Sequence, residues 1–175
     1  LLSGVQKLHD QELLHLDIKP GNIHLRQGGR PLLLDFGAVR EQMKTRLYDA
    51  RVVATSGFAP IEQQTERGYM GPWTDIYAIG ATMRSCIDGR SPPNAKIRQF
   101  NDPMKPAVEA FKKNYSPIIL KAIDWAMEPD QRLRPQNCTE LLDMLKKLPE
   151  AVVESPSFLD KFRLNNISNA LPWKK

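Results

Sequence analysis

The chain has 175 residues, of which 41% are hydrophobic and 26% are charged, and its formal net charge is +5. This length suffices for one domain with a buried core. No apolar run approaches the ~20 residues that span a bilayer, so no membrane segment is expected. Basic residues are interleaved with acidic ones along the chain, which argues against a nucleic-acid partner and leaves a small anionic ligand compatible.

The two cysteines, Cys86 and Cys138, lie far apart and in no metal-ligand spacing. Two reduced thiols in a cytoplasmic protein are therefore the expected state. No charged and apolar leader precedes the first helix, so no signal peptide is expected, and a chain that starts at Leu1 is predicted to be a piece of a longer protein.

Helical spacing of apolar residues predicts a helix within residues 1–14, with His9 on its exposed surface. A long irregular connection is expected at residues 38–72 and a proline-rich loop at residues 88–106. The pattern from Thr74 predicts another helix, in which Gly80 permits close packing. Further helices are expected over residues 107–113, 117–127 and 138–148, the last capped by Asn137 or Thr139.

A β-hairpin is predicted around Gly28 and Gly29, because strand-like runs flank this pair. A two-residue turn would place Asn22 opposite Asp35, with Asp17 in the turn beside them. An amide oxygen and a carboxylate are hard donors of the kind that Mg²⁺ prefers. The alternative is that Asn22 and Asp35 only cap the end of the hairpin.

Residues 15–22, HLDIKPGN, resemble the catalytic loop of protein kinases, and residues 35–37, DFG, resemble their metal-binding motif. Three later stretches agree in order: ATSGFAPIEQ at 54–63 resembles the end of the activation segment, WTDIYAIG at 73–80 the following helix, and PDQRLRP at 129–135 a late loop. The sequences of these motifs are most similar to those of bacterial serine/threonine kinases of the eukaryotic-like type.

The resemblance implies a mainly α fold: the C-terminal lobe of a kinase, a helical lobe with a small β-hairpin that carries the catalytic and DFG segments. The lobe is expected over residues 1–148, with the activation segment at 35–62 and a tail or linker at 149–175. No glycine-rich loop or VAIK-type lysine is present in the sequence, so the N-terminal lobe is expected to be absent. The isolated chain is therefore predicted to bind ATP weakly and to transfer no appreciable phosphate.

The resemblance also assigns roles to single residues. Asp17 would accept the proton of the substrate hydroxyl, and Lys19 would offset charge near the γ-phosphate. Asn22 and Asp35 would hold Mg²⁺ between the phosphates of ATP. His24 stands where the family usually has an aliphatic residue against adenine, and it either stacks on the base or only fills a strand position.

Other residues are implied to position these groups. His15 would pack against Phe36 of the DFG motif, which consists of Asp35, Phe36 and Gly37. Thr55 would contact Asp17 and Lys19, or else be a phosphorylation site or a plain loop threonine. The remaining expectations concern the helical body: Asp75 would brace the catalytic loop, and Glu62 would form a buried pair with Arg134.

The pattern departs from the family at two places. Leu16 replaces an arginine that grips a phosphorylated activation loop, which implies activation without that clasp, and Ile61 replaces a proline. The first hypothesis is a serine/threonine protein kinase that transfers the ATP γ-phosphate to a protein substrate. The alternatives are a pseudokinase or scaffold that binds a protein partner, and a small-molecule phosphotransferase. The activation-segment motifs argue against the last.

Overall fold

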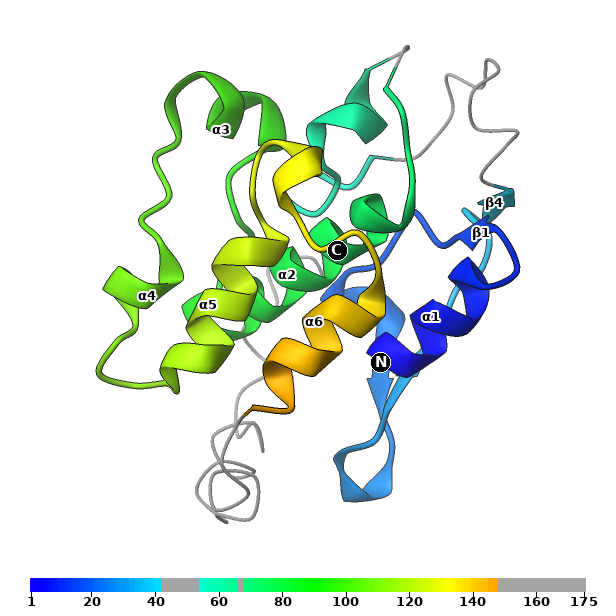
Figure 1. Cartoon of the computed structure of the whole chain (residues 1–175), viewed down its shortest axis with the longest axis horizontal. Helices are drawn as coiled ribbons and strands as arrows, with labels where there is room; N and C mark the ends of the chain where they lie inside the picture. The colour runs from blue at the N-terminus through cyan, green and yellow to red at the C-terminus, as the bar shows by residue number, and fades with distance from the viewer. Residues whose placement is uncertain (42–53, 66–67, 148–175) are drawn as a thin grey trace.

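The computed structural model describes residues 1–41, 54–65 and 68–147 (Figure 1). The fold is mainly helical, as predicted. Its helices are α1 (Leu2–His9), α2 (Pro72–Asp88), α3 (Ala95–Asn101), α4 (Ala107–Ala110), α5 (Pro117–Ala126) and α6 (Cys138–Leu145). Two short antiparallel pairs complete it: β1 (Leu13–Leu14) with β4 (Arg40–Glu41), and β2 (Ile23–Leu25) with β3 (Pro31–Leu33). The predicted tail at 149–175 and much of the predicted activation segment lie outside the described residues.

Helix α2 is the centre of the core, with α5 packed along it (Figure 1). Residues from all sides of α2 are buried, because neighbouring segments surround it. Gly80 lies at the α2–α5 contact, where an added Cβ would come 2.7 Å from Ala126 Cβ and 2.9 Å from Met127 Cγ. The close packing predicted for Gly80 is therefore confirmed.

The ends of the helices follow from local residues. Pro72 starts α2, and Gly89, with φ at 73°, ends it in the left-handed conformation that glycine adopts readily. Ser116 accepts a hydrogen bond from the Ile118 amide at the start of α5. Asn137, rather than Thr139, caps α6 by accepting a hydrogen bond from the Glu140 amide.

The hairpin is present, but the predicted register is wrong by one residue. The Arg26 amide donates to the Arg30 carbonyl and closes a three-residue loop instead of a two-residue one. Ile23 consequently pairs with Leu33, and the Leu34 amide donates to the Asn22 carbonyl. Asn22 therefore lies opposite Leu34, and Asp35 is one residue further along.

Several predicted element boundaries also need correction. The first helix ends at His9, and the rest of the predicted range contains the strand β1. The predicted loop at 88–106 contains α3, whose start is capped by Asn94 accepting from the Lys96 amide. The irregular connection at 38–72 contains β4 and a 3₁₀ turn, η4 (Ile61–Gln64). Prolines on both sides of α3 conceal this helix in the sequence, because clustered prolines are typical of loops.

Candidate active site

The carboxylate of Asp17 is the centre of a cluster of polar side chains in the loop at 15–22. Lys19 Nζ lies 3.0 and 2.8 Å from its two oxygens. Asn22 Nδ2 donates to Asp17 Oδ2 at 2.9 Å and to the Asp17 carbonyl at 2.8 Å, which closes the loop on itself. The 3₁₀ turn η1 (Pro20–Asn22) brings Asn22 back over Asp17. The loop sequence therefore presents one carboxylate held in a fixed orientation and still partly open to solvent.

Thr55 joins this cluster from a distant part of the chain. Its Oγ1 donates to Asp17 Oδ1 at 2.8 Å and accepts from Lys19 Nζ at 3.1 Å, so the predicted contact is present. Gly57, with φ at 86°, turns the chain two residues after Thr55, and a Cβ there would lie 2.5 Å from the Pro92 carbonyl oxygen. The turn thus depends on a residue without a side chain.

The oxygens proposed for Mg²⁺ lie on the hairpin. The amide nitrogen of Asn22 is occupied by Asp17, which leaves its amide oxygen for another partner. Asp35 is exposed, with φ at 58°, and its Oδ1 accepts from the Gly37 amide at 3.1 Å. Among the described residues no three His, Cys, Asp or Glu side chains gather as a closed metal site. An amide oxygen and a carboxylate are donors of the kind that Mg²⁺ takes, and this ion is usually held by few protein ligands together with nucleotide phosphates.

His24 lies on β2 and is exposed, and the hairpin and the segment that follows it also carry the exposed apolar side chains Leu25, Leu34 and Phe36. His15 is fully buried and contacts Phe36 edge to face, with ring centroids 5.3 Å apart. The Asp17 amide lies 3.4 Å from His15 Nδ1. His15 therefore supports the loop and the DFG segment, as predicted, and does not face solvent as a base would.

The backbone of Leu16 is held in an unusual conformation by two side chains. Its φ is 62°, in the left-handed region that a leucine adopts at a cost. Asp75 accepts hydrogen bonds from the His15 and Leu16 amides, each at 2.8 Å, and Gln63 Nε2 donates to the Leu16 carbonyl at 2.6 Å. Asp75 is fully buried, so the predicted brace is present.

His9 is not on the helix surface, contrary to the prediction. It is buried, with Nε2 at 2.9 Å from Asp75 Oδ2 and Nδ1 at 3.8 Å from Cys138 Sγ. Burial, and secondly the charge of Asp75, raise the pKa of Cys138 to about 12, so this thiol remains protonated. The thiol can then donate to Nδ1, which leaves the proton of a neutral imidazole on Nε2, facing Asp75.

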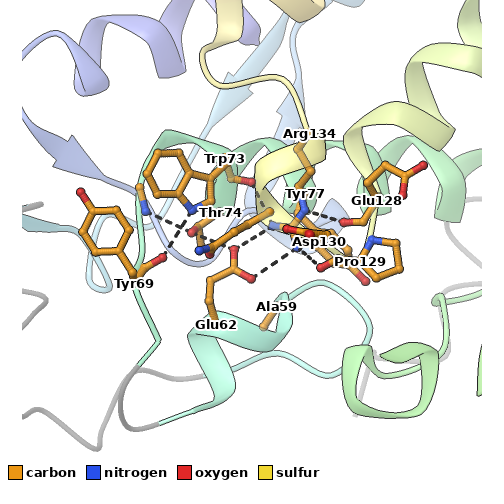
Figure 2. A network of polar contacts seen from close by, with 12 residues as sticks. Ala59, Glu62, Tyr69, Trp73, Thr74, Tyr77, Glu128, Pro129, Asp130 and Arg134 are labelled. Carbon is orange, nitrogen blue, oxygen red and sulfur yellow. Dashed lines mark hydrogen bonds and ion pairs between the residues drawn. The ribbon is translucent and has the colours of Figure 1, made fainter. Parts of the chain in front are cut away.

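Glu62 and Arg134 form the predicted buried pair, with 5% and 0% of their side chains exposed and Nη1 2.7 Å from Oε1 (Figure 2). Arg134 also donates to the carbonyls of Glu128 and Pro129, and Thr74 Oγ1 donates to Glu62 Oε1. The guanidinium lies over the ring of Tyr77, 4.7 Å from its centroid. This network ties η4 to α2 and to the loop before α6.

A second buried arginine, Arg98 of α3, was missed in the sequence. Its Nη1 donates to the Tyr77 hydroxyl at 3.0 Å and to the Met127 carbonyl at 2.8 Å. Burial lowers the pKa of Arg98, but Tyr77 and Asp102 outweigh this effect and raise it. An arginine one helical turn before Asp102 is the signal for this pair, and the loop predicted over residues 88–106 conceals it.

The family profile described as "Protein kinase domain" matches residues 1–150. The chain belongs to the protein kinase family. It is 31% identical over 153 residues to serine/threonine-protein kinase PknA of Nostoc sp., a match that covers 83% of this chain and 26% of that protein. It is 32% identical over 141 residues to serine/threonine-protein kinase D of Synechocystis sp., covering 75% of this chain and 27% of that protein.

A solved structure titled "PpkA-294 apo form" has the same fold, with a TM-score of 0.70 and 38% sequence identity. The match covers 82% of this kinase chain and 50% of that chain. The chain thus spans about a quarter of the length of the two curated relatives and matches half of a solved structure. The predicted relationship to bacterial serine/threonine kinases and the predicted fold are confirmed. None of the helices in the described ranges is both long enough and apolar enough to cross a membrane.

Proposed function

We propose that this chain is the catalytic, C-terminal lobe of a serine/threonine protein kinase, and that it transfers the γ-phosphate of ATP to a protein hydroxyl when an N-terminal lobe is present. The observation that carries the proposal is the set of donors around Asp17. Lys19, Thr55 and Asn22 all donate to its carboxylate, which fixes the two oxygens while leaving them near solvent.

In this proposal Asp17 accepts the proton of the attacking hydroxyl, and Lys19 compensates negative charge that develops on the transferred group. Thr55 would orient both side chains, and its position favours serine or threonine substrates, as the family resemblance implies. Asn22 and Asp35 would be the protein ligands of Mg²⁺. The ion, when bound, neutralises phosphate charge, while the protein contributes position and orientation.

The hairpin supports the proposal of a missing lobe. Leu25, Leu34 and Phe36 are 50%, 42% and 53% exposed, although all three lie close in sequence to the proposed ATP site. Exposed apolar side chains beside a functional site suit a surface that another element covers. We propose that the N-terminal lobe covers them and that, without it, the chain binds ATP weakly. His24, exposed on the same hairpin, would then lie against the nucleotide.

Leu16 bears on regulation. It is 3% exposed and packs with Leu14 and Met70, and a leucine side chain carries no group that could bind a phosphate. We propose that activation proceeds without such a clasp. Both cysteines are free, which suits the reducing cytoplasm that we propose as the location.

The test is transfer of labelled γ-phosphate from Mg-ATP to a generic basic protein. We would compare the 175-residue chain with a form that carries the native upstream segment, each as wild type and as Asp17→Asn. Only the extended wild type should transfer phosphate, and Asp17→Asn should lower its rate by ~10²–10⁴-fold. Asp143→Asn, an exposed carboxylate of α6 paired with Lys146, is the matched control and should leave the rate unchanged.

Two results would contradict the proposal. Phosphate transfer by the extended form that survives Asp17→Asn would remove Asp17 from the mechanism. Absence of transfer by the extended form, with its fold intact, would favour the scaffold hypothesis, and the protein partner would then be sought.

A further inference from the structure

A cavity lies at the end of α2 that is far from the catalytic loop. Its volume is about 510 Å³, and it is lined by the end of α2, the turn that follows and the segments around α4. Arg84, on its wall, is nine residues beyond Asp75, which corresponds to about 13 Å along the helix axis. The residues that matter here are Arg84, Asp88, Arg90, Met104, Lys105 and Phe111.

Arg84 is a buried cation whose hydrogen-bonding capacity is only partly used. Its side chain is 4% exposed, and Nη1 donates to the Lys105 carbonyl at 2.9 Å. Its Nε is buried without a hydrogen-bond partner among the described residues, since Asp88 Oδ2, at 3.5 Å, is too poorly placed to accept. Because a guanidinium offers five donors in a planar fork, this side chain can serve a further acceptor.

The charge around the cavity is unbalanced. Arg90 is 79% exposed, with its Nε 3.3 Å from Asp88 Oδ1, so Asp88 is shared between two arginines. Lys105 adds a third cation to the lining. Three cationic groups against one carboxylate leave a local charge of +2, which attracts an anion, and above all a dianion.

One wall of the cavity is apolar. The guanidinium of Arg84 lies over the ring of Phe111, with Cζ 4.8 Å from the centroid, and Met104 also contributes to the lining. Ligand pockets of this size commonly combine an apolar wall with a few polar groups that fix orientation. This cavity therefore suits a ligand with a charged head and an apolar body.

We propose that this cavity binds a phosphate monoester carried on an apolar body, at a site separate from the proposed active site. The dianionic head would lie between Arg84, Arg90 and Lys105, and the organic part would pack on Phe111. Arginine is the preferred partner of such groups because its fork matches phosphate oxygens. The site requires no ATP and no N-terminal lobe.

The experiment is calorimetric titration of the full chain with phenyl phosphate at low ionic strength. Inorganic phosphate tests the charge alone, benzyl alcohol the apolar body alone, and benzoate a singly charged head. Phenyl phosphate should bind at least tenfold more tightly than each of these. Its affinity should fall as salt is added, because the attraction is electrostatic.

Variants locate the site. Arg90→Gln with Lys105→Gln removes two exposed cations of the lining and should weaken binding of phenyl phosphate at least tenfold. Lys96→Gln with Lys121→Gln makes the same charge change on exposed residues elsewhere and should leave binding within twofold. Arg84→Lys keeps the positive charge but loses the planar guanidinium, and it should also weaken binding of phenyl phosphate. If this substitution at a buried position prevents folding, the double variant of Arg90 and Lys105 still tests the proposal.

Three results would overturn the proposal. The first is no binding of phenyl phosphate, or binding no tighter than that of inorganic phosphate. The second is equal weakening by the two double variants, which would indicate only the net charge of the chain. The third is loss of binding in Lys19→Gln, which would show that phenyl phosphate occupies the catalytic loop instead.

Discussion

The cluster around Asp17 and the pair of Glu62 with Arg134 are both made of charged side chains, yet their surroundings differ. Asp17 and Lys19 keep 10% and 27% of their side chains exposed, whereas Glu62 and Arg134 keep 5% and none. The half-buried cluster keeps some surface at which a ligand can bind. The buried pair meets only the protein, where Thr74, Tyr77 and backbone carbonyls surround it. Charge near solvent is thus available for chemistry, and charge in the interior fixes the position of segments.

The largest expected effect comes from breaking the buried pair. Arg134→Met leaves the Glu62 carboxylate buried without its partner and should lower the free energy of unfolding by ~3–5 kcal/mol. Denaturant unfolding measures this, with Arg132→Met as control, since Arg132 is 82% exposed and pairs with the nearby Asp130. If both variants lost the same stability, the buried pair would not be what joins η4 to the helical body.

The next effect tests the packing between α2 and α5. Gly80→Ala forces a Cβ against Ala126 and Met127, and such overpacking should cost ~1–3 kcal/mol. Gly4→Ala is the matched control, because a Cβ at this position of α1 meets nothing within 4 Å. It should leave stability unchanged or raise it by ~0.5–1 kcal/mol, the helix preference of alanine over glycine. Equal losses in thermal unfolding would refute close packing at Gly80.

The pH dependence of stability tests the burial of Cys138 next to His9 and Asp75. The pKa of Cys138 is raised from 9.0 to about 12 in the folded chain, so above pH 9 the unfolded chain loses this proton first. Its contribution to stability is complete below pH 9 and is lost as pH rises toward 12, by at most ~1.4 kcal/mol per pH unit. The free energy of unfolding of wild type minus that of Cys138→Ala should therefore fall over this range. A difference that does not vary with pH would contradict the expectation.

The smallest effect on stability is expected at the exposed hairpin. Leu34→Ser should change the stability of this chain by less than ~0.5 kcal/mol, because the side chain is already 42% exposed. In the upstream-extended form, the same change should weaken ATP binding and phosphate transfer. Ile97→Ser, at an exposed position of α3, is the control and should affect neither. Identical behaviour of the two variants would argue against a lobe packed on the hairpin.

Sequence reasoning succeeded where a motif resembles that of a known family. The contacts of Thr55, Asp75 and Arg134 join residues 38, 60 and 72 positions apart, and the resemblance to protein kinases predicts them. It failed for a residue that lies outside these motifs. His9 is buried because Asp75, 66 residues away, meets its ring, and no local periodicity reveals such a partner.

The hairpin register shows a second kind of failure. Gly28 and Gly29 both have positive φ, and such residues occur in two-residue and in three-residue hairpin loops alike. The glycine pair therefore does not determine the length of the loop. The hydrogen bond from Arg26 to Arg30 determines it and shifts every pair by one. The cavity at Arg84 cannot be predicted from the sequence either, since segments far apart along the chain line it.

Gly57 carries a consequence for how the chain tolerates substitution. It has no functional group, yet any side chain at this position would meet the Pro92 carbonyl oxygen and move the turn that delivers Thr55 to Asp17. In a scan of all single substitutions read out by growth or activity, position 57 should therefore score as intolerant as position 17, while the exposed neighbour Ser56 accepts many residues. Gly57 would therefore be as sensitive to substitution as Asp17, although its contribution is only the absence of a side chain next to Pro92.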